Sequence, residues 1–208
     1  MTQQAARIRQ EMKTPRAAAV AGILFSLLGI TSFLLFRISV PPNPLSQPTG
    51  MVRHTKTISL ALYLLPFAGI AFLWFIGVIR DRLGEYEDRF VATVFLGSGL
   101  LFVAMIFTGA TEVAGIITVL DHERAGLIQS GSYHLGRVEA YQTMNIYAAK
   151  MAGVFMMATC TITLRTRTLP RWMALLGYAL ALILLLSIGR FEWLFLLFPL
   201  WVLLMGAC

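Results

Sequence analysis

The chain has 208 residues, of which 58% are hydrophobic and 13% are charged, and its formal net charge is +7. Soluble domains are about 45–50% apolar and about 25% charged, so the composition excludes an ordinary soluble domain of this size. The basic residues lie between apolar runs and form no continuous stripe. This arrangement argues against nucleic-acid binding and favours contact with anionic lipid headgroups. We therefore expect the lipid bilayer to be the main partner of the chain.

Apolar runs recur along the whole chain, separated by short polar connections. A transmembrane helix needs about 20 mostly apolar residues. By this measure the sequence predicts a single all-α domain, a polytopic bundle of six transmembrane helices. The predicted helices cover residues 17–36, 57–79, 90–120, 141–164, 172–188 and 191–207.

Two of the predicted helices have unusual lengths. The third, at residues 90–120, would be about 46 Å long at 1.5 Å per residue, so it must tilt or project beyond the bilayer. The sixth, at residues 191–207, is short, contains Pro199 and follows the fifth after a brief turn. We expect the fifth and sixth helices to form a tight antiparallel hairpin.

The distribution of lysine and arginine between the loops predicts the orientation. If the N-terminus is cytoplasmic, ten basic residues fall on the cytoplasmic side and six on the other side, with Lys150 inside a helix. Because cytoplasmic loops carry the excess of basic residues, the count favours a cytoplasmic N-terminus and C-terminus.

Glu112 and Lys150 are charged residues that lie several residues inside the predicted helices. A charge in hydrocarbon is costly, so Glu112 should face the bundle interior. A stripe of small and polar residues shares its helix face, namely Gly97, Ala104, Thr108, Thr111, Gly115 and Thr118. Counting from the predicted helix ends places Glu112 and Lys150 at similar depth, which predicts an ion pair or a water-bridged equivalent. Two alternatives stay open: Lys150 reaches the interface alone, or a protonated Glu112 serves as a helix contact.

The start of the fourth predicted helix is rich in polar side chains, including Tyr141, Asn145 and Tyr147. With Thr108 and Thr111 they are candidates for the lining of a cavity that also contains Glu112. Alternatively, this helix begins in the headgroup region, where tyrosine is favoured.

Metal and enzyme motifs are missing from the sequence. Acids and histidines gather at 121–123 and recur as His134 and Glu139, but no HExxH motif or ExxH pair is present. No nucleophile–base pair can be assembled either. We therefore expect no metal, no cofactor and no enzymatic activity.

Two segments resemble a known class of protein. They are FLWFIGVIRDRLGEYEDRFVATVFLGSGLLF at residues 72–102 and FPLWVLL at residues 198–204. Both are similar to small multi-spanning membrane proteins of unknown function found in bacteria, especially actinobacteria. The resemblance implies a six-helix architecture in the bacterial cytoplasmic membrane, and it implies no catalytic residues.

Three functional hypotheses follow. The leading one is a non-enzymatic structural or accessory membrane component, with a membrane-protein partner or a second copy of the chain left open. The alternative is a small transporter or proton-coupled carrier that uses the Glu112 and Lys150 pair. The third, a lipid-modifying enzyme, lacks the residues that its chemistry needs.

Overall fold

The computed structural model describes residues 2–83, 89–166, 170–187 and 192–207, with side chains for 17–80, 89–166, 170–187 and 193–206. Every regular element in these ranges is a helix, which confirms the all-α prediction for this part of the chain. The α-helices are α1 (Thr2–Ser39), α2 (Thr49–Arg53), α3 (Thr55–Leu83), α4 (Arg89–His122), α5 (Arg124–Gln129), α6 (Ser132–Gln142), α7 (Ala149–Thr166), α8 (Arg171–Leu186) and α9 (Leu197–Ala207). A π-helical turn, η2 (Thr143–Ala148), joins α6 to α7, and a 3₁₀ helix, η3 (Glu192–Leu196), precedes α9.

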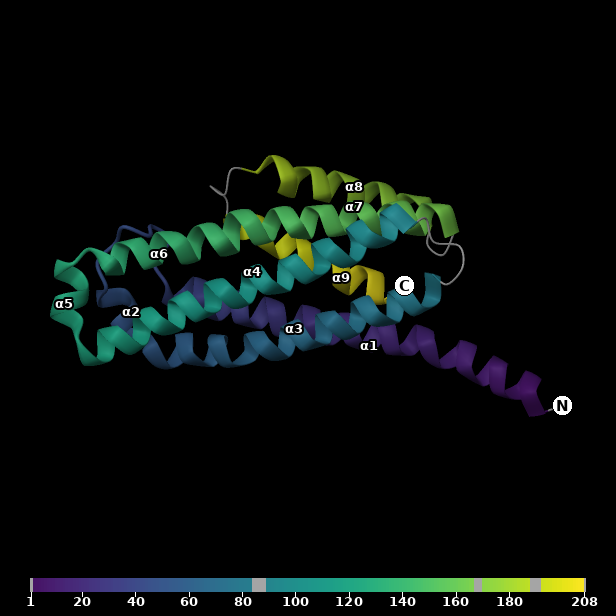
Figure 1. The fold of residues 1–208 in the computed structure, drawn as a ribbon, viewed down its shortest axis with the longest axis horizontal. Coiled ribbons are helices and arrows are strands. Elements are labelled where there is room, and N and C mark those ends of the chain that lie inside the picture. The colour runs from purple at the N-terminus through teal and green to yellow at the C-terminus, as the bar shows by residue number, and fades with distance from the viewer. Residues whose placement is uncertain (1, 84–88, 167–169, 188–191, 208) are drawn as a thin grey trace.

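Four helical segments are long and apolar enough to cross a membrane. They are Ala17–Ser39, Thr55–Arg80, Arg89–His122 and Ser132–Thr166, and two shorter apolar helices cover Arg171–Leu186 and Trp193–Gly206. Figure 1 shows that successive segments alternate in direction, so that α1 begins and α9 ends toward the same end of the bundle. The predicted helix ends at Ile188 and Phe191 lie outside the described residues.

The fourth predicted helix differs from the one observed. The sequence placed its start at Tyr141, whereas a continuous helix runs from Ser132 to Thr166 through the π-helical turn. The added residues include Arg137 and Glu139, which carry charge and therefore escape a hydropathy criterion. At the other end of the connection, Gly131 has a φ of 73°, a left-handed conformation that favours glycine and lets the chain turn from α5 into α6.

Phenylalanine side chains from five helices form the centre of the bundle. The ring of Phe72 lies 4.7 Å from Phe25 of α1, 5.3 Å from Phe102 of α4, 5.1 Å from Phe155 of α7 and 5.5 Å from Phe198 of α9, measured between ring centroids. Most of these pairs are edge-to-face, the geometry that the ring quadrupoles prefer. The cluster therefore joins every long segment of the bundle around one residue of α3.

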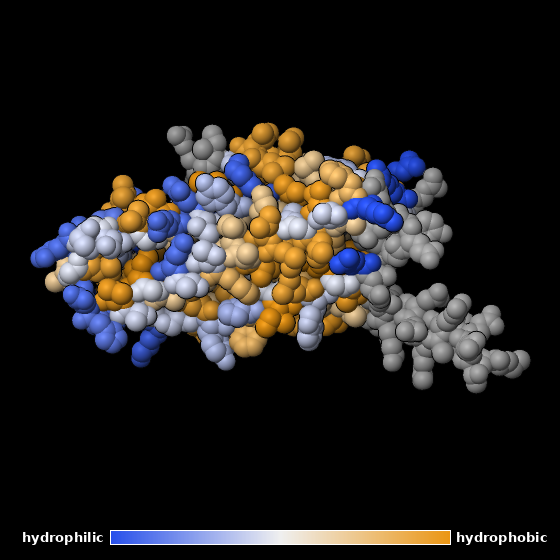
Figure 2. Space-filling view, viewed as in Figure 1, coloured by the Kyte–Doolittle hydropathy of each residue, from blue (hydrophilic) through white to orange (hydrophobic). Residues whose placement is uncertain are grey.

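A second, smaller core lies at the end of the bundle that carries α2, α5 and α6. Its fully buried members include Met51, Ile58 and Tyr133, packed against Val113, Ile116 and Leu120 of α4 and Ala140 of α6. We call this region, made of α2, α5, α6 and the adjoining ends of α3 and α4, the polar cap. Figure 2 shows hydrophilic side chains gathered over its surface and a hydrophobic band across the neighbouring part of the bundle.

The proline of the last segment is accommodated at its start. Pro199 is the third residue of α9, where a helix has no intrahelical partner for the missing N–H. The hydroxyl of Ser26 lies 2.8 Å from the carbonyl oxygens of both Gly22 and Pro199. This buried contact connects α1 to α9.

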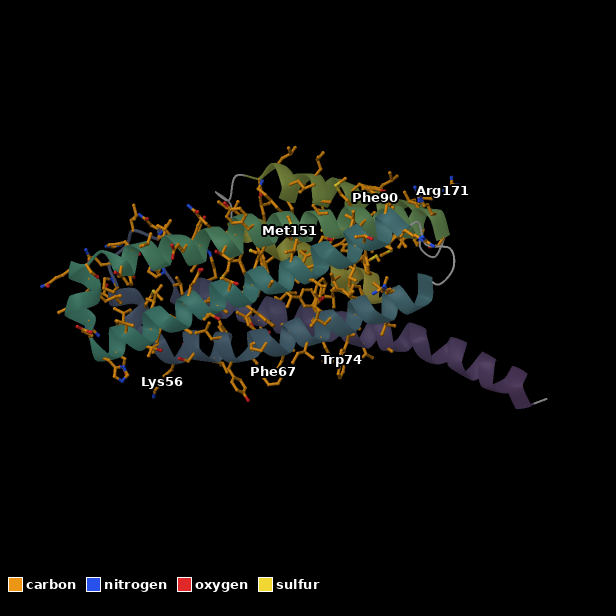
Figure 3. The ribbon with its side chains drawn as sticks, viewed as in Figure 1. Lys56, Phe67, Trp74, Phe90, Met151 and Arg171 are labelled. Carbon is orange, nitrogen blue, oxygen red and sulfur yellow. The ribbon has the colours of Figure 1, made fainter. Side chains whose placement is uncertain are left out.

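Phe72 provides a stability test, since it is fully buried while Phe67 on the same helix is 48% exposed and points away from the bundle (Figure 3). Replacing Phe72 with alanine should lower the free energy of unfolding by about 3–5 kcal/mol, because it leaves a cavity among four helices. The matched Phe67→Ala variant should lose less than about 1 kcal/mol. Unfolding titrations in mixed micelles measure both, and equal losses would contradict this view of the core.

Candidate functional site

Glu112 lies in α4 and is only half-buried. One of its carboxylate oxygens, Oε2, is buried and has no hydrogen-bond partner. The residues of the predicted stripe do not face the interior: Ala104, Thr108, Thr111, Gly115 and Thr118 are exposed. The hydroxyls of Thr111 and Thr118 donate to carbonyls four residues earlier in their own helix. The prediction that this stripe lines the inside of the bundle is therefore wrong.

The register between α4 and the α6–α7 helix separates Glu112 from Lys150. A Cβ atom at Gly99 would lie 3.2 Å from Phe155, one at Gly109 would lie 3.5 Å from the carbonyl oxygen of Ala140, and one at Gly136 would lie 3.2 Å from Ile116. This antiparallel register places Glu112 level with Ala140 and Lys150 level with Phe102. The two levels differ by ten residues of α4, or about 15 Å.

Lys150 bonds to a backbone carbonyl instead of an acid. Its Nζ donates to the carbonyl oxygen of Leu185, at 3.0 Å, in the last turn of α8. The last carbonyls of a helix lack intrahelical donors and carry a partial negative charge. Ser187 satisfies the two preceding carbonyls, through its N–H to Ile183 and its hydroxyl to Leu184. Lys150 therefore contributes to the C-terminal cap of α8.

The predicted direct ion pair is thus not formed between these two described residues. The sequence prediction assumed that the fourth helix begins at Tyr141, whereas Ser132 begins it and moves Lys150 farther from the α4–α6 connection. The charged group that acts on Glu112 is instead Glu139 of α6. A carrier mechanism that needs Glu112 and Lys150 in one cavity has no geometric basis here.

A cavity lies between α1, α3, α4, the α6–η2 segment and the η3–α9 segment. Its volume is about 140 Å³, and most of its wall is apolar. Tyr141 and Asn145 contribute to this wall as predicted candidates, whereas Thr108, Thr111, Glu112 and Lys150 do not. Tyr147 is 57% exposed and points elsewhere. Asn145 belongs to the π-helical turn, and its amide donates to the carbonyl of Tyr141 at 3.1 Å.

The residue that sequence reasoning missed is Arg137, which lines the cavity and is only 5% exposed. Its Nη2 donates to the carbonyls of Pro41 at 2.7 Å and Asn43 at 3.4 Å. Its Nη1 donates to the hydroxyl of Tyr133 at 3.2 Å and to the sulfur of Met51 at 3.4 Å. None of the described acids forms an ion pair with it.

Arg37, the last basic residue of α1, lines the same cavity. Its guanidinium carbon lies 5.4 Å from the ring centroid of Trp193, a cation–π contact that joins α1 to η3. In the sequence, Arg37 and Arg137 contribute only to the count of basic residues that predicts the orientation in the membrane. The spacing of 100 residues between them gives no signal of their shared cavity.

The acids and histidines near 121–139 do not converge. Among the described residues, no group of three or more His, Cys, Asp or Glu side chains is placed to hold a metal ion. Comparisons with protein-family models, curated proteins and solved structures found no match to the chain. The resemblance to multi-spanning bacterial membrane proteins stays a prediction.

A double-mutant cycle tests the separation of Glu112 from Lys150. Replacing Lys150 with methionine should cost about 1–3 kcal/mol of unfolding free energy, because the Leu185 carbonyl loses its donor. Replacing Glu112 with glutamine should cost less than about 1 kcal/mol, since no partner is lost. The two effects should add within about 0.5 kcal/mol in mixed-micelle unfolding titrations. A coupling above about 1 kcal/mol would restore the ion-pair hypothesis.

Proposed function

We propose that this chain is a non-enzymatic integral membrane component with six spans and with both termini on the cytoplasmic side. The observation that carries the proposal is the exposed apolar surface of the bundle. Phe67 and Trp74, for example, project outward from α3, and their exposed fractions are 48% and 66% (Figure 3). Such surface is stable in contact with lipid and not with water.

Arginines at one end of the bundle support the orientation. Arg80, Arg89, Arg165 and Arg171 are exposed at the end opposite the polar cap, and Figure 3 shows Arg171 there, with Lys56 at the cap end. A stretch of 20 helical residues spans the roughly 30 Å of hydrocarbon. Counted from Arg89, a stretch of 20 residues of α4 ends at Gly109. Counted backwards from Arg165, a stretch of 20 residues of the α6–α7 helix begins at Asn145. This placement puts Glu112 and the polar cap on the non-cytoplasmic side.

The lengths of the last two segments agree with a role as shorter spans. Arg171–Leu186 and Trp193–Gly206 are about 24 Å and 21 Å long at 1.5 Å per residue. A span shorter than the bilayer is accommodated by local thinning and by residues that reach the interface. The Arg37–Trp193 contact and the Lys150 cap of α8 lie where such a short span ends.

The cavity wall is mostly apolar, and its polar side chains, among the described residues, are Arg37, Arg137, Tyr141 and Asn145. The cytoplasmic membrane of a bacterium is the location that the resemblance of residues 72–102 implies.

Reporter fusions test the orientation. Alkaline phosphatase, which folds only outside the cytoplasm, should be active when fused after Gln129 of α5 and inactive when fused after Thr166 or Ala207. A fluorescent protein that folds in the cytoplasm should give the reverse pattern at the same three positions. Activity of the phosphatase at Ala207 would contradict the six-span arrangement. Extraction of the chain from membranes by alkaline carbonate would contradict membrane integration itself.

A further inference from the structure

The cavity changes in character from one end to the other. Its deep end is lined by Phe25, Phe102 and Pro199, and its other end by Arg37, Arg137 and Pro41. Because Phe25 and Arg37 lie on the same helix, their spacing of twelve residues gives the cavity a depth of about 18 Å. One leaflet contributes about 15 Å of the hydrocarbon core. The cavity therefore matches the thickness of one leaflet, with its charged end toward the polar cap.

Arg137 gives this charged end a positive charge that no acidic side chain among the described residues pairs with. Its described partners are carbonyl oxygens, a hydroxyl and a thioether, and all of them are uncharged. A buried charge without an opposite charge is costly unless something else compensates it. Two of its four contacts, to Asn43 and Met51, are 3.4 Å long and so are weak. The N–H groups of Arg137 that make these two weak contacts can instead donate to a stronger acceptor, such as a phosphate oxygen.

We propose that the cavity binds one anionic phospholipid of the non-cytoplasmic leaflet, with the headgroup phosphate against Arg137 and the first part of one acyl chain, as much as about 140 Å³ holds, among the phenylalanines. The proposal rests on the membrane placement proposed above. Arginine recognises phosphate oxygens through paired, charge-assisted N–H donors. A cavity that is apolar at one end and positively charged at the other fits the two ends of a lipid, whereas a small soluble anion would leave the phenylalanine end unused.

A purely structural role for Arg137 is the competing account. In that account its bonds to Pro41 and Asn43 hold the loop after α1 against α6, and the cavity has no specific occupant. Substitution of Arg137 alone would disturb both roles. The decisive variant must therefore fill the cavity without touching Arg137.

Gly29 of α1 offers that variant. It lines the cavity, and a Cβ atom there would meet only Phe25, at 3.8 Å. A leucine at this position extends into the cavity and is also a better helix former than glycine. Gly77 of α3 is a matched control, because it is exposed and a Cβ there would meet nothing within 4 Å. Both Gly29→Leu and Gly77→Leu should keep the melting temperature of the parent chain.

Native mass spectrometry of delipidated protein in detergent measures the binding. Titration with phosphatidylglycerol should give one bound lipid, about tenfold tighter than diacylglycerol or oleate, which lack the phosphate, since a charge-assisted phosphate contact accounts for at least this factor. Phosphatidylcholine has the same phosphate but also a trimethylammonium group, which the cationic end of the cavity repels, so it should bind more weakly than phosphatidylglycerol. Gly29→Leu should weaken phosphatidylglycerol binding about tenfold, and Gly77→Leu should leave it unchanged. Arg137→Met should reduce the preference for phosphatidylglycerol over diacylglycerol.

Several results would overturn the proposal. Equal binding of all four lipids, or binding that Gly29→Leu leaves unchanged, would show that the cavity is not a phospholipid site. Preferential binding of oleate would replace the phospholipid with a free fatty acid as occupant. Because reporter fusions and carbonate extraction test the membrane placement without any lipid titration, a failure there is distinguishable from a failure of lipid recognition.

Discussion

The constraint that shapes this protein is that polar backbone groups at helix ends must find partners inside an apolar bundle. Carbonyl oxygens at such ends have no intrahelical donor, and lipid supplies none. Two cationic side chains satisfy them here: Arg137 at the carbonyls that follow α1, and Lys150 at the end of α8. Lys150 meets the partial negative charge at the C-terminus of α8 and so requires no acid as partner, whereas Arg137 has only uncharged hydrogen-bond partners among the described residues. Lys150 thus caps a helix end, and Arg137 holds the loop that follows α1.

This constraint also explains how the bundle divides into two parts. α8 stops at Leu186, and its end is level with Lys150 in the middle of the Ser132–Thr166 helix. α4 and the α6–α7 helix continue beyond that level and bring their extra residues together around Tyr133 and Met51. The excess length of α4, which appeared as a mismatch with the bilayer, builds the polar cap. The cavity lies where the phenylalanine core of the bundle meets this cap, since its lining includes both Phe25 and Phe102 of the core and Met51 and Arg137 of the cap.

The sequence predicted the helical class and the positions of the long apolar helices, because hydropathy reports burial in lipid or protein directly. It did not predict α6, since Arg137 and Glu139 interrupt the apolar pattern while Tyr133 and Ala140 still bury one face. That error shifted the start of the helix and produced the pairing of Glu112 with Lys150. The direction of the threonine stripe was also unpredictable, because small and polar residues suit both a helix contact and an exposed face whose hydroxyls bond within their own helix.

The placement of the polar cap outside the membrane is the central claim, and cysteine accessibility tests it most directly. In a chain with Cys160 and Cys208 replaced by alanine, single cysteines at Leu100, Glu112 and Glu139 can be exposed to a membrane-impermeant maleimide in intact cells. Labelling at Glu112 and Glu139, together with protection at Leu100, is the result that the register and the position of the arginines predict. Protection of Glu112 to the same extent as Leu100 would place it within the hydrocarbon and contradict the account.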